Sequence, residues 1–240
     1  MCLVLLNTCS VLWSVASVMS TTLLLGAHLS SHWLLGHPVI LHHNTPLPPP
    51  AAHDSNSTTV ITGWVGEVEV RPSLGLWLRC TVMAAKKGGA ARQYCGVYAT
   101  TGADLPAAQV VAMASLVTGT GIAVLATLSM LLSACCRVVR KKSIFNIAGT
   151  MHALAGVFCI LGLSVYPLSW GCVRVQLQCG PMAGEYSAGN CSIGWALYSG
   201  LAGTALLLVC AVWAVFVDKT ISSNRAEEEI RRGNHFVCLM

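Results

Sequence analysis

The sequence is short of charged residues. Only 10% of its 240 residues are Asp, Glu, Lys or Arg, and none of these four occurs before Asp54. A soluble domain usually carries about 25% charge. A surface with so few charges would not stay soluble in water, so we infer that lipid surrounds most of the chain. No basic stripe with interleaved aromatic residues occurs either, so the composition does not indicate nucleic-acid binding.

Groupings of residues that carry catalysis are also missing from the sequence. It shows no convergent Ser/His/Asp set, no metal-ligand quartet and no phosphate-binding loop, so we expect no enzymatic activity and no cofactor. Histidines are frequent but loosely spaced, whereas a metal site needs ligands held in a fixed geometry. We therefore do not predict metal binding for this group. It comprises His28, His32, His37, His42, His43 and His53.

Long apolar runs, in contrast, are present. A helix that crosses a bilayer needs about 20 predominantly apolar residues, and four segments meet this requirement: 3–32, 107–134, 144–166 and 193–217. The alternating pattern of a membrane β-barrel is absent from the sequence. The sequence therefore predicts a single membrane domain with four spanning helices.

The distribution of Lys and Arg predicts the orientation. Residues 135–143 and the tail 218–240 each hold four basic residues, whereas 167–192 hold only Arg174. Short basic segments face the cytosol, so both termini are expected there, with loops 33–106 and 167–192 outside. In an alternative interpretation the first run is a cleaved signal peptide, although it lacks a basic start and is longer than usual.

The first outer loop divides into two parts. Residues 37–62 are rich in Pro, His, Ser and Thr, and we interpret them as a flexible insertion with a polyproline stretch at Pro46–Pro50. Asn56 starts an N-glycosylation sequon within it. Asn190 also starts a sequon, but a paired cysteine near the membrane should hinder its modification.

The second part of this loop begins with residues 63–70, which alternate like a half-buried strand. We expect a small antiparallel sheet in which Cys80 pairs with Cys95, because the secretory route is oxidising. Cys179 and Cys191 are placed to pair in the second loop. Free or cross-paired cysteines remain the alternative, because sequence does not prove connectivity.

Several residues within or beside the spans are candidates for function. His152 lies in the third run without ionisable neighbours, which favours a neutral histidine bonded to another helix over a proton relay. Cys135 and Cys136 are palmitoylation candidates, with plain membrane-boundary cysteines as the alternative. Small residues recur at helical spacing, which favours close packing within the bundle over a docking face for a partner helix. These stripes comprise Ser115, Gly119 and Ala123, then Gly149 and Ala153, then Ala196 and Gly200.

Two blocks carry a resemblance to a known family. The first reads Gly75-Leu76-Trp77-x-x-Cys80 followed by Cys95, and the second contains Tyr166-Pro167-x-x-Trp170 and Gly194-Trp195. At these residues the chain resembles the lipoma HMGIC fusion partner-like tetraspans, relatives of the claudin and peripheral-myelin-protein group. The resemblance covers nearly the whole chain except residues 37–62 and the tail.

The resemblance implies an all-α membrane fold, a left-handed claudin-like bundle of four transmembrane helices capped by a small extracellular antiparallel sheet. It implies a non-enzymatic plasma-membrane protein that serves as an auxiliary or assembly subunit. Such subunits bind and stabilise or traffic other integral membrane proteins, including receptor channels, mechanotransduction components and cadherin-type partners. The alternatives are a junction or adhesion protein, which would self-associate, and a pore, which the spans disfavour because they offer no ring of charges.

The second block also departs from the family pattern. Gly171-Cys172-Val173-Arg174 stands where the family has an acidic stretch. Cys172 becomes an odd cysteine in an outer loop, which indicates a free thiol or an intermolecular bond.

Overall fold

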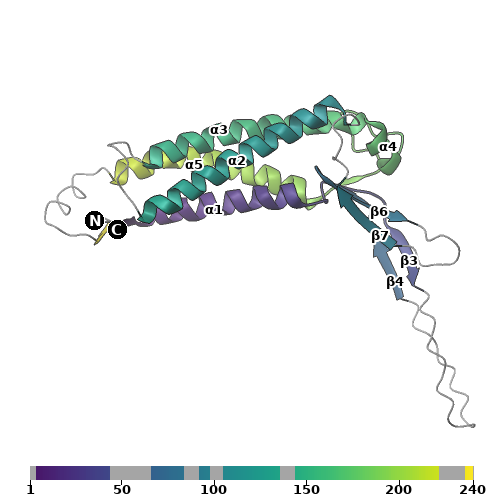
Figure 1. Cartoon of the computed structure of the whole chain (residues 1–240), viewed down its shortest axis with the longest axis horizontal. Coiled ribbons are helices and arrows are strands. Elements are labelled where there is room, and N and C mark those ends of the chain that lie inside the picture. Colours follow the sequence, from purple (N-terminus) through teal and green to yellow (C-terminus); the bar gives the residue numbers. More distant parts are fainter. Residues whose placement is uncertain are drawn as a thin grey trace, which may run out of the picture.

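Four long helices lie side by side in the computed structural model (Figure 1). They are α1 (Thr8–Leu29), α2 (Ala107–Cys135), α3 (Ile144–Val165) and α5 (Trp195–Ile221). Helix α3 contacts both α2 and α5, and α5 also contacts α1. The structure describes residues 4–43, 66–83, 92–97, 105–135, 144–221 and 236–239.

The helices are long and apolar enough to cross a membrane. The candidate spans are Cys9–Leu29, Ala107–Leu131, Asn146–Gly171 and Trp195–Asp218. Large apolar side chains point outward from all four helices, for example Val15, Leu125 and Val157. Such surfaces are unfavourable in water and favourable in lipid. The predicted four-helix membrane fold is therefore confirmed.

Small residues let the helices approach closely. A Cβ atom on Gly119 of α2 would lie 2.7 Å from Cys159 Sγ of α3. A Cβ atom on Gly149 of α3 would lie 2.5 Å from Ala214 Cβ of α5. Both glycines thus lie at contacts between helices of this bundle, where van der Waals packing stabilises association in lipid. These contacts favour the interpretation that the small residues pack within the bundle.

A five-stranded antiparallel sheet lies at one end of the bundle, beyond the end of α1 (Figure 1). Its strand order is β7 (Arg92–Val97), β6 (Leu78–Met83), β5 (Ser73–Leu74), β2 (Leu34–Leu35) and β8 (Ser192–Ile193). Strand β2 follows α1 and strand β8 precedes α5, so the sheet joins the first and second predicted outer loops. The order places Cys80 of β6 directly opposite Cys95 of β7.

Two short helices lie at the same end of the bundle as the sheet. A 3-10 helix, η2 (Tyr166–Gly171), continues α3, and α4 (Val173–Cys179) follows it. Both chain ends lie at the opposite end (Figure 1), where β1 (Val4–Asn7) pairs in parallel with β9 (Phe236–Leu239). An even number of helices returns the chain to the side from which it started.

The structure differs from the sequence-based interpretation in three places. Val39–His43 forms strand β3 and pairs with β4 (Gly66–Val70), so the prediction of a flexible insertion is wrong for these five residues. Val39 and Ile40 are β-branched, a residue type common in strands, and the segment pairs with the alternating residues of β4. Val4–Asn7 is a strand rather than the start of the first helix, and the second outer loop contains η2 and α4, which the sequence did not predict.

Candidate functional site

The sheet end of the bundle concentrates the residues of the family motifs, and Gly75 shows why the first motif needs a glycine. Gly75 N–H donates to Leu78 O at 2.8 Å, which closes the turn between β5 and β6. A Cβ atom at this position would overlap Ser30 O and lie 2.8 Å from Ser31 Cα, just beyond the end of α1. The adjacent Leu76 is fully buried. The motif therefore anchors the sheet directly on the end of the first helix.

An aromatic cluster joins the end of α1 to the end of α3. Trp33 and Tyr166 meet edge to face with ring centroids 4.9 Å apart, and Tyr166 meets Trp170 at 6.0 Å. Trp33 Nε1–H donates to Ala27 O at 2.7 Å, so this polar atom is satisfied inside the cluster. Pro167, in the first turn of η2, suits a helix start because it has no N–H to lose. The second motif thus fixes the direction in which the chain leaves the bundle.

Gly194 forms a second crossing with the residues that follow α1. Its N–H donates to Trp33 O at 2.9 Å, and Ala196 N–H donates to His32 O at 3.2 Å. A Cβ atom on Gly194 would overlap His32 O. Trp195 stacks on His32 with centroids 6.4 Å apart. The start of α5 is therefore fixed to the chain between α1 and β2 through backbone groups.

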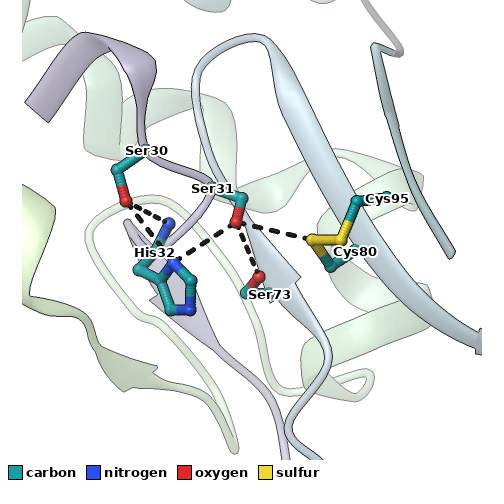
Figure 2. The surroundings of a disulfide bond; sticks show 6 residues. All are labelled: Ser30, Ser31, His32, Ser73, Cys80 and Cys95. Carbon is teal, nitrogen blue, oxygen red and sulfur yellow. Dashed lines mark hydrogen bonds between the residues drawn. A yellow bond between two sulfur atoms is a disulfide. The ribbon is translucent and has the colours of Figure 1, made fainter. Parts of the chain in front are cut away.

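A serine cluster lies between this crossing and the first disulfide (Figure 2). Cys80 and Cys95 are disulfide-bonded, and Ser31 Oγ lies 3.5 Å from Cys80 Sγ. Ser73, which is fully buried, donates to Ser31 Oγ at 3.2 Å. His32 N–H donates to Ser30 Oγ at 3.0 Å. These contacts link β5, β6 and the end of α1, and nothing in the sequence pattern singled out the serines.

A second disulfide joins Cys179, at the end of α4, to Cys191. Asn190 N–H donates to Cys179 O at 2.8 Å, and Gln176 donates to Ala183 O at 3.2 Å, so the loop after α4 is fixed to that helix. Tyr186, whose φ of 58° is unusual for a residue with a side chain, donates its hydroxyl to Ser164 O at 3.0 Å. The loop is thereby held against the last turn of α3.

Apolar side chains project from α4 and from the loop that follows it. We call Val173, Leu177, Met182 and Tyr186 the α4 surface. Leu177 and Met182 are each 77% exposed and Val173 is 71% exposed. They lie between α3 and α5 in the chain, outside the four candidate membrane spans. Exposed apolar side chains on a rigid support are typical of protein contact sites.

A polar network lies inside the bundle itself. His152 Nδ1 lies 2.7 Å from Ala148 O and therefore carries the proton, which leaves Nε2 to accept from Ser17 Oγ at 2.6 Å in the neutral ring. Thr127 lies 2.9 Å from Thr21 across the interface between α1 and α2. The structure agrees with the interpretation of His152 as a residue bonded to another helix.

The remaining candidates have different surroundings. His28 lies 2.7 Å from Thr120 inside the bundle, whereas His32 is exposed beside Trp195. Within the described residues, no group of three or more His, Cys, Asp or Glu side chains is placed to hold a metal ion. Cys172 is half-buried and is not disulfide-bonded. Cys135 ends α2, whereas Asn56 and Cys136 lie outside the described residues.

A four-helix membrane bundle with a disulfide-bonded sheet on one end defines a tetraspan protein of the claudin-like class. A family model for the lipoma HMGIC fusion partner-like proteins matches residues 9–219. The chain belongs to this family, as the motifs predicted.

Curated relatives agree with this assignment. The chain is 35% identical to the LHFPL tetraspan subfamily member 2a protein of Danio rerio and 32% identical to the human member 2 protein, over 100% of both chains in each case. It is 28% identical to the member 4 protein of Bos taurus over 92 residues, which are 38% of this chain and 37% of that one.

Proposed function

We propose that this protein is a non-enzymatic auxiliary or assembly subunit that binds other integral membrane proteins and stabilises or traffics them. Its partners would be channel or receptor subunits or cadherin-type proteins. The observation that supports this role best is the α4 surface, which combines exposed apolar side chains with a rigid support. A rigid contact surface loses little conformational entropy on binding, which favours recognition of a defined partner.

The α4 surface is suited to a protein contact. A disulfide, two hydrogen bonds within the loop and the Tyr186 contact with α3 hold it in one arrangement. Leu177 and Met182 have no described side chain covering most of their area. Burial of two such side chains against a partner contributes about 1.5–3 kcal/mol each. This gain supports an interface centred on the second outer loop.

A charge substitution on the α4 surface tests the proposal. Leu177→Glu combined with Met182→Glu should abolish co-purification of the specific larger membrane protein that the wild type retains in mild detergent. The reason is that two desolvated carboxylates would disfavour the bound state. Quantitative mass spectrometry of the purified complexes is the measurement. Ser187→Glu adds a charge to the same exposed loop without removing an apolar contact and should leave the complex intact.

Two results would contradict the auxiliary role. If the wild type recovers only copies of itself and concentrates at contacts between cells, the junction or adhesion function holds instead. If the Leu177→Glu, Met182→Glu variant folds and still retains every partner, the α4 surface is not the contact site.

We further propose that the protein resides in the plasma membrane with both termini in the cytosol and the sheet end outside. The basic segments 135–143 and 218–240 support this orientation. The location of both termini at the end opposite the sheet supports it too (Figure 1).

Glycosylation of Asn56 tests the orientation. The wild type should migrate faster in electrophoresis after peptide N-glycosidase treatment, because the sequon enters the secretory lumen with the first outer loop. Asn56→Gln should migrate at the faster position without treatment and should not shift further. A treated wild type that does not shift, together with protease access to the sheet end from the cytosol, would reverse the proposed orientation.

A further inference from the structure

A cavity of about 600 Å³ lies at the sheet end, between β6, the start of α2 and the segment from η2 to α4. Its lining comprises Arg79, Leu105, Pro106, Gly171, Cys172, Val173, Arg174 and Leu177. Two of these residues are arginines, and none of the described lining residues is acidic. Half of the lining is apolar. The cavity therefore combines positive charge with a surface that suits hydrocarbon.

Arg79 contributes a hydrogen-bond donor that the protein leaves unused. Its Nε is buried and has no hydrogen-bond partner among the described residues. A buried donor without a partner is unfavourable, and an anionic oxygen in the cavity would satisfy it once the guanidinium group turns toward that oxygen. The guanidinium group presents its N–H groups as a planar fork that matches the two oxygens of a carboxylate or phosphate. Arg79 thus favours an anion as the occupant.

Arg174 of α4 provides the second cation in the lining. It lies in the first turn of α4 and lines the cavity. Glu185 is nearby, since its Cγ would lie 3.8 Å from a Cβ atom on Gly171, but it is exposed and does not line the cavity. Arg174 therefore adds a second positive charge to the lining of the cavity.

The apolar part of the lining distinguishes an amphiphile from a small ion. Leu105 and Pro106 immediately precede α2, so the cavity lies beside the start of a candidate membrane span. Leu177 extends the apolar surface outward from α4. A free phosphate ion would leave these side chains in contact with water, whereas the first methylene groups of a lipid would cover them.

We propose that this cavity binds the anionic headgroup of a membrane lipid. Arg79 and Arg174 hold its phosphate or carboxylate oxygens, and Leu105, Pro106 and Leu177 contact the start of its tail. This site goes beyond the partner-binding role: it shares Val173 and Leu177 with the α4 surface, but its two arginines are not part of that surface.

Cys172 reports on occupancy, because its half-buried thiol lines the cavity. The full chain is placed in nanodiscs of phosphatidylcholine with increasing fractions of phosphatidylserine, and the rate of maleimide labelling is measured. Cys172→Ser supplies the background from the other free cysteines. Labelling should slow as phosphatidylserine increases. We define the midpoint as the phosphatidylserine fraction at which half of the decrease in labelling rate has occurred. Arg79→Gln and Arg174→Gln should each raise this midpoint about tenfold, which is the effect of losing one charged hydrogen-bonding group.

Arg71→Gln is the matched control, because Arg71 is exposed at the same end and does not line the cavity. It removes one positive charge and should leave the midpoint unchanged. If Arg71→Gln and Arg79→Gln shift the midpoint equally, general surface charge attracts the lipid, and the proposal of a specific site is wrong. A labelling rate of Cys172 that does not change with the phosphatidylserine fraction would also contradict the proposal. If inorganic phosphate protects Cys172 equally well in phosphatidylcholine nanodiscs, the apolar walls contribute nothing and the lipid assignment fails.

Discussion

Gly194→Ala should lower the free energy of unfolding by about 4 kcal/mol, because the added methyl group has no space. Its Cβ would overlap His32 O, which is a backbone atom and accepts from Ala196 N–H. The chain can relieve the overlap only by separating the start of α5 from the end of α1. This separation would also weaken the hydrogen bond from Gly194 N–H to Trp33 O. Reversible unfolding in mixed micelles, followed by tryptophan fluorescence, measures the effect.

Gly184→Ala is the control for this substitution. Gly184 lies at the same end of the molecule, and a Cβ atom there would meet nothing within 4 Å. It should change stability by less than about 0.5 kcal/mol, as substitutions away from contacts usually do. If Gly194→Ala is as stable as Gly184→Ala, the close crossing of the two chain segments does not exist as described.

His152→Ala should lower the free energy of unfolding by about 3–4 kcal/mol. The imidazole ring is fully buried, bonds to Ser17 and packs 5.6 Å from the ring of Trp13. Hydrogen bonds within membranes contribute only about 0.6 kcal/mol on average, so most of the loss comes from the cavity that alanine leaves. The same unfolding measurement in mixed micelles applies.

Two further substitutions at His152 separate the effect of the cavity from the effect of the lost hydrogen bond to Ser17. His152→Leu fills the space but leaves Ser17 Oγ only its longer contact with Thr127 Oγ1, at 3.3 Å, so its loss of stability should be smaller than that of His152→Ala. His152→Gln keeps a polar atom and much of the side-chain volume, so it should lower the free energy of unfolding least of the three. Val157→Ala, on the lipid-facing side of the same helix, is the control, because Val157 is 61% exposed. A His152→Ala variant no less stable than Val157→Ala would contradict the interior network.

The spanning helices could be predicted from the sequence because lipid imposes a simple requirement on them. Each helix must satisfy its own backbone hydrogen bonds and cover about 30 Å with apolar side chains. Both properties depend on composition over a window of about 20 residues. The paired cysteines were also predicted, since Cys80 and Cys95 flank a turn between alternating segments. The structure places them opposite each other on neighbouring strands.

The side-chain contacts between helices of the bundle could not be predicted in the same way. His152 was recognised as a buried polar residue, but its bond to Ser17 joins residues 135 positions apart. No local pattern indicates which hydroxyl faces which imidazole, because this depends on the rotation of α1 relative to α3. The small residues at Gly119 and Gly149 indicated close packing, and only the assembled helices show which neighbour each one contacts.

The sequence by itself determined the four spans, the family and the cysteines of the outer loops, because these follow from local composition and short motifs. The tertiary structure decided how those loops combine. Short strands from both loops share one sheet, and the glycines at 75 and 194 fit against the residues that follow α1. It also placed Arg79 and Arg174, 95 residues apart in the chain, in the lining of one cavity. Such contacts depend on the packing of distant segments, which local sequence patterns do not encode.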